Sequence, residues 1–276
     1  LDFHSDMLAT SLLLFSYYYF DREKWQKFFI FMLLSLLCKE YVSLIFIMLG
    51  LYSLFKRKNA KISLAILAIG TLWFFAAFKV IPGFIKSGKE SMPIANYAHL
   101  GTSMSEVIKN ILAHPVTALG PYINFKNISA MALLLLPLGF LSFFGIITLS
   151  IGFPIIAGVI IASLFSYANH HNGTIIPFIF ISAISGSCYL FNRFRYKYKN
   201  IAFAIGIFVL SCSLFSNVIY GVVPLSWQFW YKPSYRYWGN LHQYKISEHD
   251  NIANKIVSMI PAKASVSASN HLASHL

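Results

Sequence analysis

Long apolar stretches alternate with short polar clusters over most of the chain. A bilayer core about 30 Å thick needs about 20 mostly apolar residues for each helical span. The apolar stretches cover residues 7–20, 28–55, 62–80, 130–149, 151–168, 174–191 and 201–220. The pattern therefore predicts an all-α polytopic membrane protein with seven or eight transmembrane helices, depending on how the long stretch at 28–55 is divided.

The composition supports this class. The chain has 57% hydrophobic and 11% charged residues, whereas soluble domains carry about 25% charged residues. The net charge of +13 comes from basic residues grouped in short blocks at the ends of apolar stretches, which is typical of membrane anchoring and not of nucleic-acid binding. Cys38, Cys188 and Cys212 lie in apolar stretches without paired spacing, so neither a disulfide framework nor a zinc site is expected.

Two basic clusters, at 56–61 and 193–199, set the expected orientation. Lysine and arginine in short loops favour the cytoplasmic side, and the four apolar stretches between the clusters place both on that side. The segment 82–129, the turn at 169–172 and everything after Val223 are then external, and a short turn at 150–154 is internal. We expect a transmembrane helical domain at 1–223 and an external segment at 224–276, in a chain that is a piece of a longer protein.

The stretch 28–55 allows two arrangements, because Lys39 and Glu40 interrupt it. Two short helices that break near Lys39 would place the charged loop at 21–27 inside and residues 1–6 outside. One long tilted helix would place the same loop outside, against the charge rule. We prefer the two short helices.

Two groups of ionisable residues are candidates for chemistry near the first helices. Asp2, His4 and Asp6 alternate just before the first apolar stretch and suit acid-base or metal contacts, although they also fit a solvated flank. Lys39 and Glu40 lie inside an apolar stretch, where ionisable groups are costly and usually face a partner or a wet cavity. The alternative is a hairpin tip whose lysine reaches to the interface.

The external segments carry further candidates. His99 precedes the sequence Ser103–Glu106, which predicts a capping box and an amphipathic helix that lies in the interface or packs over the bundle. His170 and His171 form a polar turn that suits a phosphate, sugar or metal contact, or is an ordinary loop.

The carboxy-terminal part begins with aromatic residues over 227–238. They fit either an interfacial belt or a platform that stacks sugar rings while Arg236 meets a phosphate. A capped helix over 247–260 and a strand-like segment at 264–268 follow, which predicts the start of a small external α/β region.

Several short motifs, in their order along the chain, resemble a prokaryotic family of predicted membrane proteins known as domain of unknown function 2079. The motifs are Asp2–Asp6, Cys38–Glu40, His99–Gly101, Ser105–Val107, Leu134–Gly139, His171 with Pro177 and Phe178, and Pro261–Ala268 with His271. The family is similar to the GT-C type of integral membrane glycosyltransferases. The resemblance implies a multi-pass protein of the prokaryotic plasma or inner membrane that transfers a sugar from a polyprenyl-phosphate donor on the external face.

The resemblance leads to the following expected roles. Asp2 or Asp6 serves as the catalytic base or contacts a divalent metal, and Lys39 meets the leaving phosphate. Contacts to substrate are expected from His4, Glu40, His99, His170, His171 and Arg236. The expected partners are the lipid bilayer and a polyprenyl-phosphate-linked sugar. A transporter or lipid flippase is the alternative function, and a structural membrane protein without catalysis is the third.

Overall fold

The structure is a computed structural model that describes residues 4–56, 59–80, 97–162, 170–221, 224–230, 246–261 and 264. Within these residues the chain is helical and contains no strand. The first helices are α1 (Ser5–Asp21), α2 (Trp25–Leu36), α3 (Val42–Phe55), α4 (Ala60–Phe75), the π-helical turn η1 (Ala76–Val80), α7 (Met104–Ala113), α8 (Pro115–Leu119) and the 3₁₀ turn η2 (Gly120–Tyr122). The strand-like segment expected at 264–268 lies almost wholly outside the described residues.

The remaining elements complete the helical order. They are α9 (Phe125–Leu135), η3 (Leu136–Leu138), η4 (Leu141–Gly145), α10 (Ile146–Leu149), η5 (Ser150–Gly152), α11 (Phe153–Ile161), η6 (His170–Thr174), α12 (Ile176–Phe194), α13 (Ile201–Tyr220), α14 (Trp227–Trp230) and α15 (Glu248–Ser258). The expected capping box of α15 is present, because Ser247 and Asp250 exchange hydrogen bonds between side chain and backbone.

The chain divides into two compact units. One, which we call the helical body, runs from His4 to Cys212, and the other is formed mainly by the residues from Ser213 onward. The candidate site described below lies within the helical body.

Four helical stretches are long and apolar enough to cross a membrane by length and composition. They are Ala60–Val80, Leu141–Ile161, Asn172–Phe194 and Ile201–Tyr220. Trp25–Leu36, Val42–Phe55 and Phe125–Leu138 are shorter apolar helices. The expectation of a helical membrane protein is confirmed at this level, because apolar helices of this length suit a lipid bilayer.

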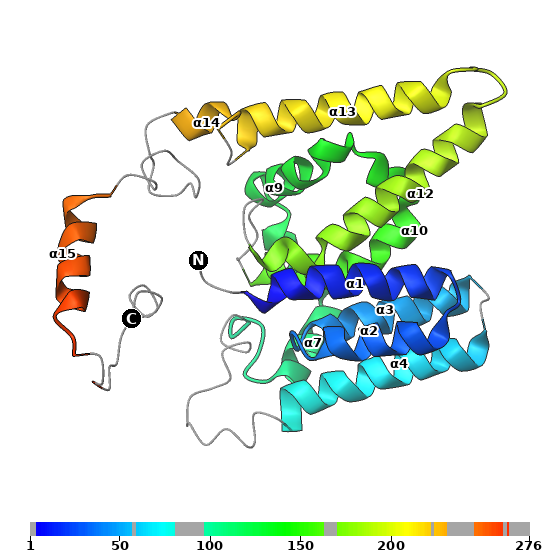
Figure 1. The fold of residues 1–276 in the computed structure, drawn as a ribbon. Coiled ribbons are helices and arrows are strands. Elements are labelled where there is room, and N and C mark those ends of the chain that lie inside the picture. Colours follow the sequence, from blue (N-terminus) through cyan, green and yellow to red (C-terminus); the bar gives the residue numbers. More distant parts are fainter. Residues whose placement is uncertain are drawn as a thin grey trace. The chain divides into compact units, whose positions relative to one another are not determined.

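The break expected near Lys39 is confirmed. α2 ends at Leu36 and α3 begins at Val42, so a single tilted helix through residues 28–55 is wrong. Figure 1 shows α1, α2, α3 and α4 side by side. A charged pair in the middle of an apolar helix is costly in a bilayer, and the chain turns where that pair occurs.

The expected turn at 150–154 is wrong. Residues 141–161 form one helical stretch, and the chain turns instead at Gly139 and Phe140, whose φ angles are 58° and 59°. Gly139 adopts this left-handed conformation at no steric cost. Pro154 does not interrupt the helix, because it lies in the first turn of α11, where a missing N–H does little harm.

Close packing between helices relies on small residues, as is common in membranes. α3 and α4 meet where the Ser53 and Ser63 hydroxyls lie 2.6 Å apart in the interior. The stretch η4 packs on α12 through a hydrogen bond of 2.8 Å from the Ser142 hydroxyl to the Ile179 carbonyl. Gly145 and Gly186 line the same contact, where backbone approaches backbone.

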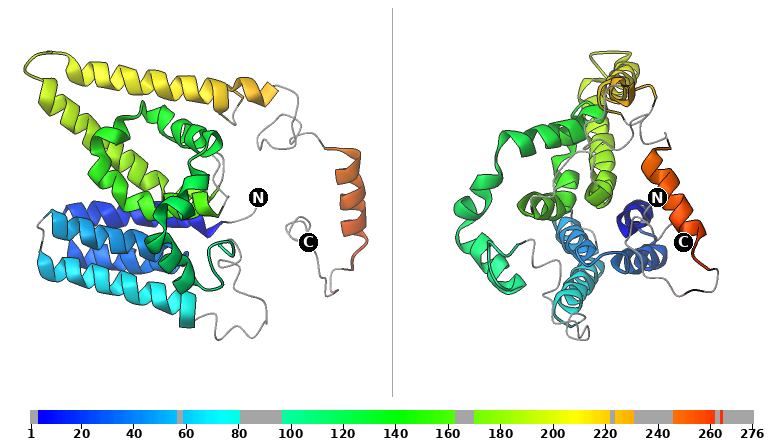
Figure 2. Two further views of the ribbon diagram at one scale, coloured as in Figure 1. Left: turned by 180° about the vertical axis from the view of Figure 1, so that it is seen from behind. Right: turned by 90° about the vertical axis from the view of Figure 1, so that its left-hand side faces the viewer.

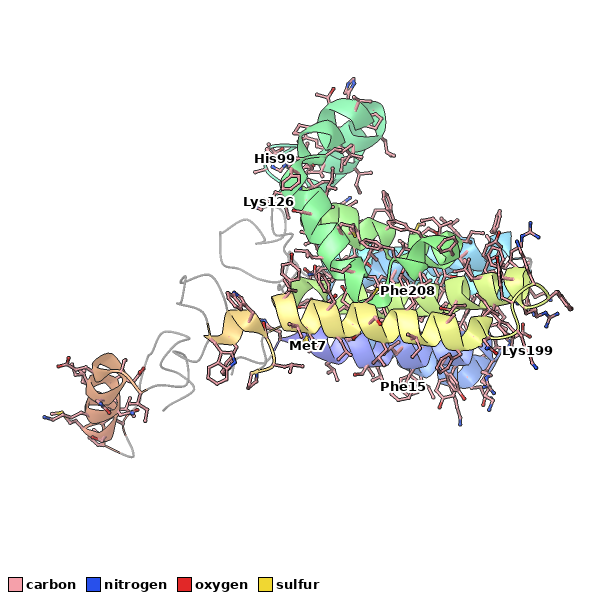
Figure 3. All side chains as sticks on the ribbon, turned by 90° about the horizontal axis from the view of Figure 1, so that it is seen from above. Met7, Phe15, His99, Lys126, Lys199 and Phe208 are labelled. Carbon is pink, nitrogen blue, oxygen red and sulfur yellow. The ribbon has the colours of Figure 1, made fainter. Side chains whose placement is uncertain are left out.

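The two ends of the helical body differ in charge. The turn between α1 and α2, the facing ends of α3 and α4, and the turn between α12 and α13 lie at one end (Figures 1 and 2). Both expected basic clusters fall in these connections, as the even number of stretches between them predicts. In Figure 3 Lys199 lies at this end, and Met7 lies toward the opposite end. That opposite end contains the start of α1 and the break between α2 and α3.

Candidate functional site

A buried carboxylate marks the end of the helical body opposite the basic clusters. Asp6 lies in the first turn of α1 and is fully buried. The Tyr41 hydroxyl donates a hydrogen bond to Asp6 Oδ1. The Lys39 Nζ lies 3.7 Å from Asp6 Oδ2. The solvated-flank alternative therefore does not hold for Asp6.

The local sequence explains this placement. A carboxylate in the first helical turn is favoured by the partial positive charge of the helix amino terminus, and His4, which is exposed, precedes that turn as the N-cap residue. α1 packs on α2 in the antiparallel sense (Figure 1). The chain segment that follows α2 thus returns to the start of α1, which brings Lys39 and Tyr41 to Asp6.

Lys39 and Glu40 face different partners. Lys39 pairs with Asp6, whereas Glu40 lies close enough to Tyr97 for its charge to act on that phenol. Burial raises the pKa of the Tyr97 hydroxyl, and the Glu40 carboxylate raises this pKa further. The hydroxyl stays protonated and donates a hydrogen bond of 3.1 Å to the Gly158 carbonyl at α11. The break between α2 and α3 thus contacts α1, and its Glu40 charge acts on Tyr97.

The turn η6 also reaches the amino terminus of α1. The Thr10 hydroxyl donates to the Gly173 carbonyl at 2.7 Å, and a Cβ at Gly173 would lie 3.1 Å from the Asp6 carbonyl oxygen. Asn172 and Thr174 are buried on either side of this glycine. The backbone that carries His170 and His171 is therefore placed beside Asp6, although the two histidine side chains lie outside the described residues.

The segment after Tyr97 forms its own polar contacts. The His99 Nε2 and Tyr122 hydroxyl are hydrogen-bonded at 2.5 Å. Ser103 caps α7 as expected, by accepting from the Glu106 amide. The Glu106 carboxylate accepts from the hydroxyl and the backbone of Thr102, and these bonds hold its pKa below the ordinary value. Among the described residues, no hydrogen bond or ion pair joins His99 to Asp6.

Sequence reasoning missed two residues of this site. Tyr41 follows the Lys39 and Glu40 pair and is partly buried, and a tyrosine hydroxyl at such a position usually finds a polar partner. Thr10 stands four residues after Asp6, so both lie on one face of α1. Cys38 also lies near Asp6. Burial raises the pKa of the Cys38 thiol, and the charge of the Asp6 carboxylate raises this pKa further.

Two predicted site residues, Asp2 and Arg236, lie outside the described residues. Among the described residues there is no group of three or more His, Cys, Asp or Glu side chains that could hold a metal ion.

The fold and the site define a helical membrane protein that has a buried carboxylate, paired with a half-buried lysine, at one end of its helical body. The chain belongs to the family of predicted membrane proteins DUF2079, whose model matches residues 1–276. The family membership predicted from the sequence is thus confirmed. No curated protein and no solved structure matches the chain.

Proposed function

We propose that the protein is a GT-C type integral membrane glycosyltransferase that uses a polyprenyl-phosphate-linked sugar on the external face. The observation that carries this proposal is the pairing of buried Asp6 with half-buried Lys39 at the end of the helical body opposite the basic clusters. Those clusters favour the cytoplasmic side, so the pair would face the external leaflet. A general base and a cation for a leaving phosphate are what sugar transfer from a lipid phosphate requires.

In the proposed reaction the acceptor hydroxyl oxygen attacks the anomeric carbon of the donor sugar. Its proton passes to the Asp6 carboxylate, and the bond between the anomeric carbon and the phosphate oxygen breaks. The electron pair of that bond leaves with the polyprenyl phosphate, whose charge the Lys39 ammonium stabilises. Tyr41 is a positioning residue, because its hydroxyl holds the other carboxylate oxygen of Asp6.

The other predicted contacts keep their roles as proposals. His4 is exposed beside Asp6 and suits a hydroxyl of the sugar or acceptor. His170 and His171 belong to the turn η6, whose backbone meets α1 at Gly173, and suit the same substrate. Arg236 lies outside the described residues, and its phosphate contact stays a prediction.

The transporter alternative receives less support. A transport path would show ionisable side chains at several depths. Among the residues that the structure describes, Asp6 is the one fully buried charged side chain, and Lys39 lies beside it. The charges are gathered at one level, which suits a surface reaction site better than a path across the bilayer.

A reconstituted assay tests the proposed function. The full chain in lipid nanodiscs is incubated with a panel of polyprenyl-phosphate monosaccharides and a glycan acceptor, and mass spectrometry measures the polyprenyl phosphate released and the sugar transferred. We expect transfer with at least one donor, its loss in Asp6→Asn, and unchanged transfer in Lys109→Ala, an exposed lysine of α7. Absence of turnover in the parent protein, or equal turnover in Asp6→Asn, would contradict the proposal.

A further inference from the structure

The Lys39 ammonium is held loosely. Its distance of 3.7 Å from Asp6 Oδ2 exceeds the usual hydrogen-bond length of about 2.7–3.2 Å. An ammonium has three donors, and none of them makes a hydrogen bond to another described residue. The side chain is 29% exposed, so an anion that arrives from outside the helical body meets it first.

The Asp6 carboxylate is held at one oxygen only. Tyr41 donates to Oδ1, whereas Oδ2 is buried and accepts no hydrogen bond from any residue that the structure describes. The charge that faces Oδ2 among these residues is the Lys39 ammonium. The contact between the two side chains is thus an ion pair without a hydrogen bond, and Tyr41 keeps the carboxylate in place without it.

We propose that Lys39 is the binding site for the phosphate of a polyprenyl-phosphate lipid, and that Asp6 and this phosphate compete for the Lys39 ammonium. This inference rests on the proposed function and adds a mode of regulation to it. In the resting protein Asp6 occupies Lys39. When the lipid phosphate binds, Lys39 turns to it, and Asp6 Oδ2 is left without a cation.

The competition has a consequence for the order of events. While the Lys39 ammonium lies over Asp6 Oδ2, that oxygen is covered. An acceptor hydroxyl therefore reaches Oδ2 only once the donor phosphate has drawn Lys39 away. Donor binding would precede acceptor activation, and the lipid phosphate would switch on the base that consumes it.

The residues around the pair permit this exchange. Lys39 lies in the break between α2 and α3, outside regular helix, and its four-carbon stem lets the ammonium move between two partners. Glu40, the adjacent charge, acts on Tyr97 and makes no ion pair with Lys39 among the described residues. Asp6 itself is fixed by α1 and Tyr41.

The inference is tested by the binding of undecaprenyl phosphate to the full chain in nanodiscs, measured by native mass spectrometry. The direction in which a mutation changes the binding affinity decides the outcome. Asp6→Asn preserves the shape and still accepts from Tyr41, but it removes the competing charge. We expect Asp6→Asn to tighten binding about threefold or more, and Lys39→Gln to weaken it. Weaker or unchanged binding in Asp6→Asn overturns the competition, provided that its thermal unfolding matches the parent.

Matched arms identify the anion and separate this inference from the proposed function. Lys126→Ala, an exposed lysine of α9, should leave binding unchanged. Phosphatidylglycerol and inorganic phosphate replace the probe, and equal competition by either shows an unselective anion site and overturns the lipid assignment. Tighter binding in Asp6→Asn without sugar transfer in the parent contradicts the proposed function alone. Transfer without tighter binding contradicts this inference alone.

Discussion

Replacing Gly186 by alanine tests a close helix contact in the helical body. Gly186 lies in α12, and a Cβ added there would lie 2.1 Å from the Leu141 carbonyl oxygen. Ordinary van der Waals contact begins near 3.4 Å, so the added methyl is more than an ångström too close. The obstructing atom is backbone, which cannot rotate away as a side chain would.

The expected cost follows from this geometry. Inserting a methyl group into a closely packed contact costs about 1–3 kcal/mol. For a domain of this size each kcal/mol corresponds to roughly 2–4 °C in the unfolding midpoint, so Gly186→Ala should lower the midpoint by about 2–12 °C. The measurement is thermal unfolding in nanodiscs, followed by intrinsic tryptophan fluorescence and by size-exclusion chromatography.

Gly206 provides the control. It lies inside α13, and a Cβ there would meet nothing within 4 Å. Alanine inside a helix is favoured over glycine by about 0.5–1 kcal/mol, so Gly206→Ala should leave the midpoint unchanged or raise it slightly. If Gly186→Ala and Gly206→Ala unfold at the same temperature, α12 does not pack on the 141–161 stretch as described.

Three further predictions concern Cys38, the surfaces of α7 and α9, and Glu106. The first is the pH dependence of Cys38 alkylation by a maleimide, measured with the other two cysteines replaced by serine. The Asp6 carboxylate is one of the two causes that raise the pKa of this thiol, so Asp6→Asn should shift the alkylation profile to lower pH. An unshifted profile would contradict the contact between Asp6 and Cys38. Spin labels at Leu112 and Phe125, which are 76% and 86% exposed, should be relaxed by oxygen dissolved in lipid, whereas a label at Glu106 should respond to an aqueous reagent, as an interfacial helix requires. The pKa of Glu106 is lowered in the folded chain, so the stabilisation that its carboxylate gives to α7 is complete above the ordinary value of 4.5 and is lost as the pH falls through the lowered value. Amide exchange in α7, corrected for intrinsic rates, should therefore accelerate in acid. Glu106→Gln should remove that pH dependence.

Much of the fold could be predicted because its causes are local. Apolar stretches of span length identify membrane helices, and the Lys39 and Glu40 pair marked the break between α2 and α3. The capping residues Ser103 and Ser247 marked helix starts. Each of these signals lies within a few residues of the feature that it predicts.

The wrong turn at 150–154 has a different origin. Ser150, Gly152 and Pro154 resemble a connector, but the chain stays helical there: it passes through a 3₁₀ turn at Ser150–Gly152 and continues as α11, whose first turn tolerates Pro154. The actual turn uses Phe140 with a positive φ, which is uncommon for a residue with a bulky side chain. Only the packing of the 141–161 stretch on α12 decides between the two positions, and that packing joins residues far apart in the sequence.

The site shows the same limit. The sequence identifies Asp6, Lys39 and Glu40 as candidate site residues. It does not predict their partners, because the pairing depends on how α1 lies against α2 and α3. Tyr41 gave no signal of its own beyond its position next to two charges. The structure adds the choice of partners: the Lys39 ammonium faces Asp6, and the charge of Glu40 acts on the Tyr97 phenol.

This choice of partners bears on why the pair exists. A buried ion pair often contributes little to stability, since desolvation of the charges offsets their attraction, and well-packed apolar residues would join the same helices at lower cost. The contact between Asp6 and Lys39 contributes even less to stability than a typical buried ion pair, because it lacks a hydrogen bond and Tyr41 already holds the carboxylate in place. Because the Lys39 ammonium is only weakly held by Asp6 in the resting protein, it can exchange this carboxylate for a phosphate. Chemistry therefore accounts for the pair better than stability does.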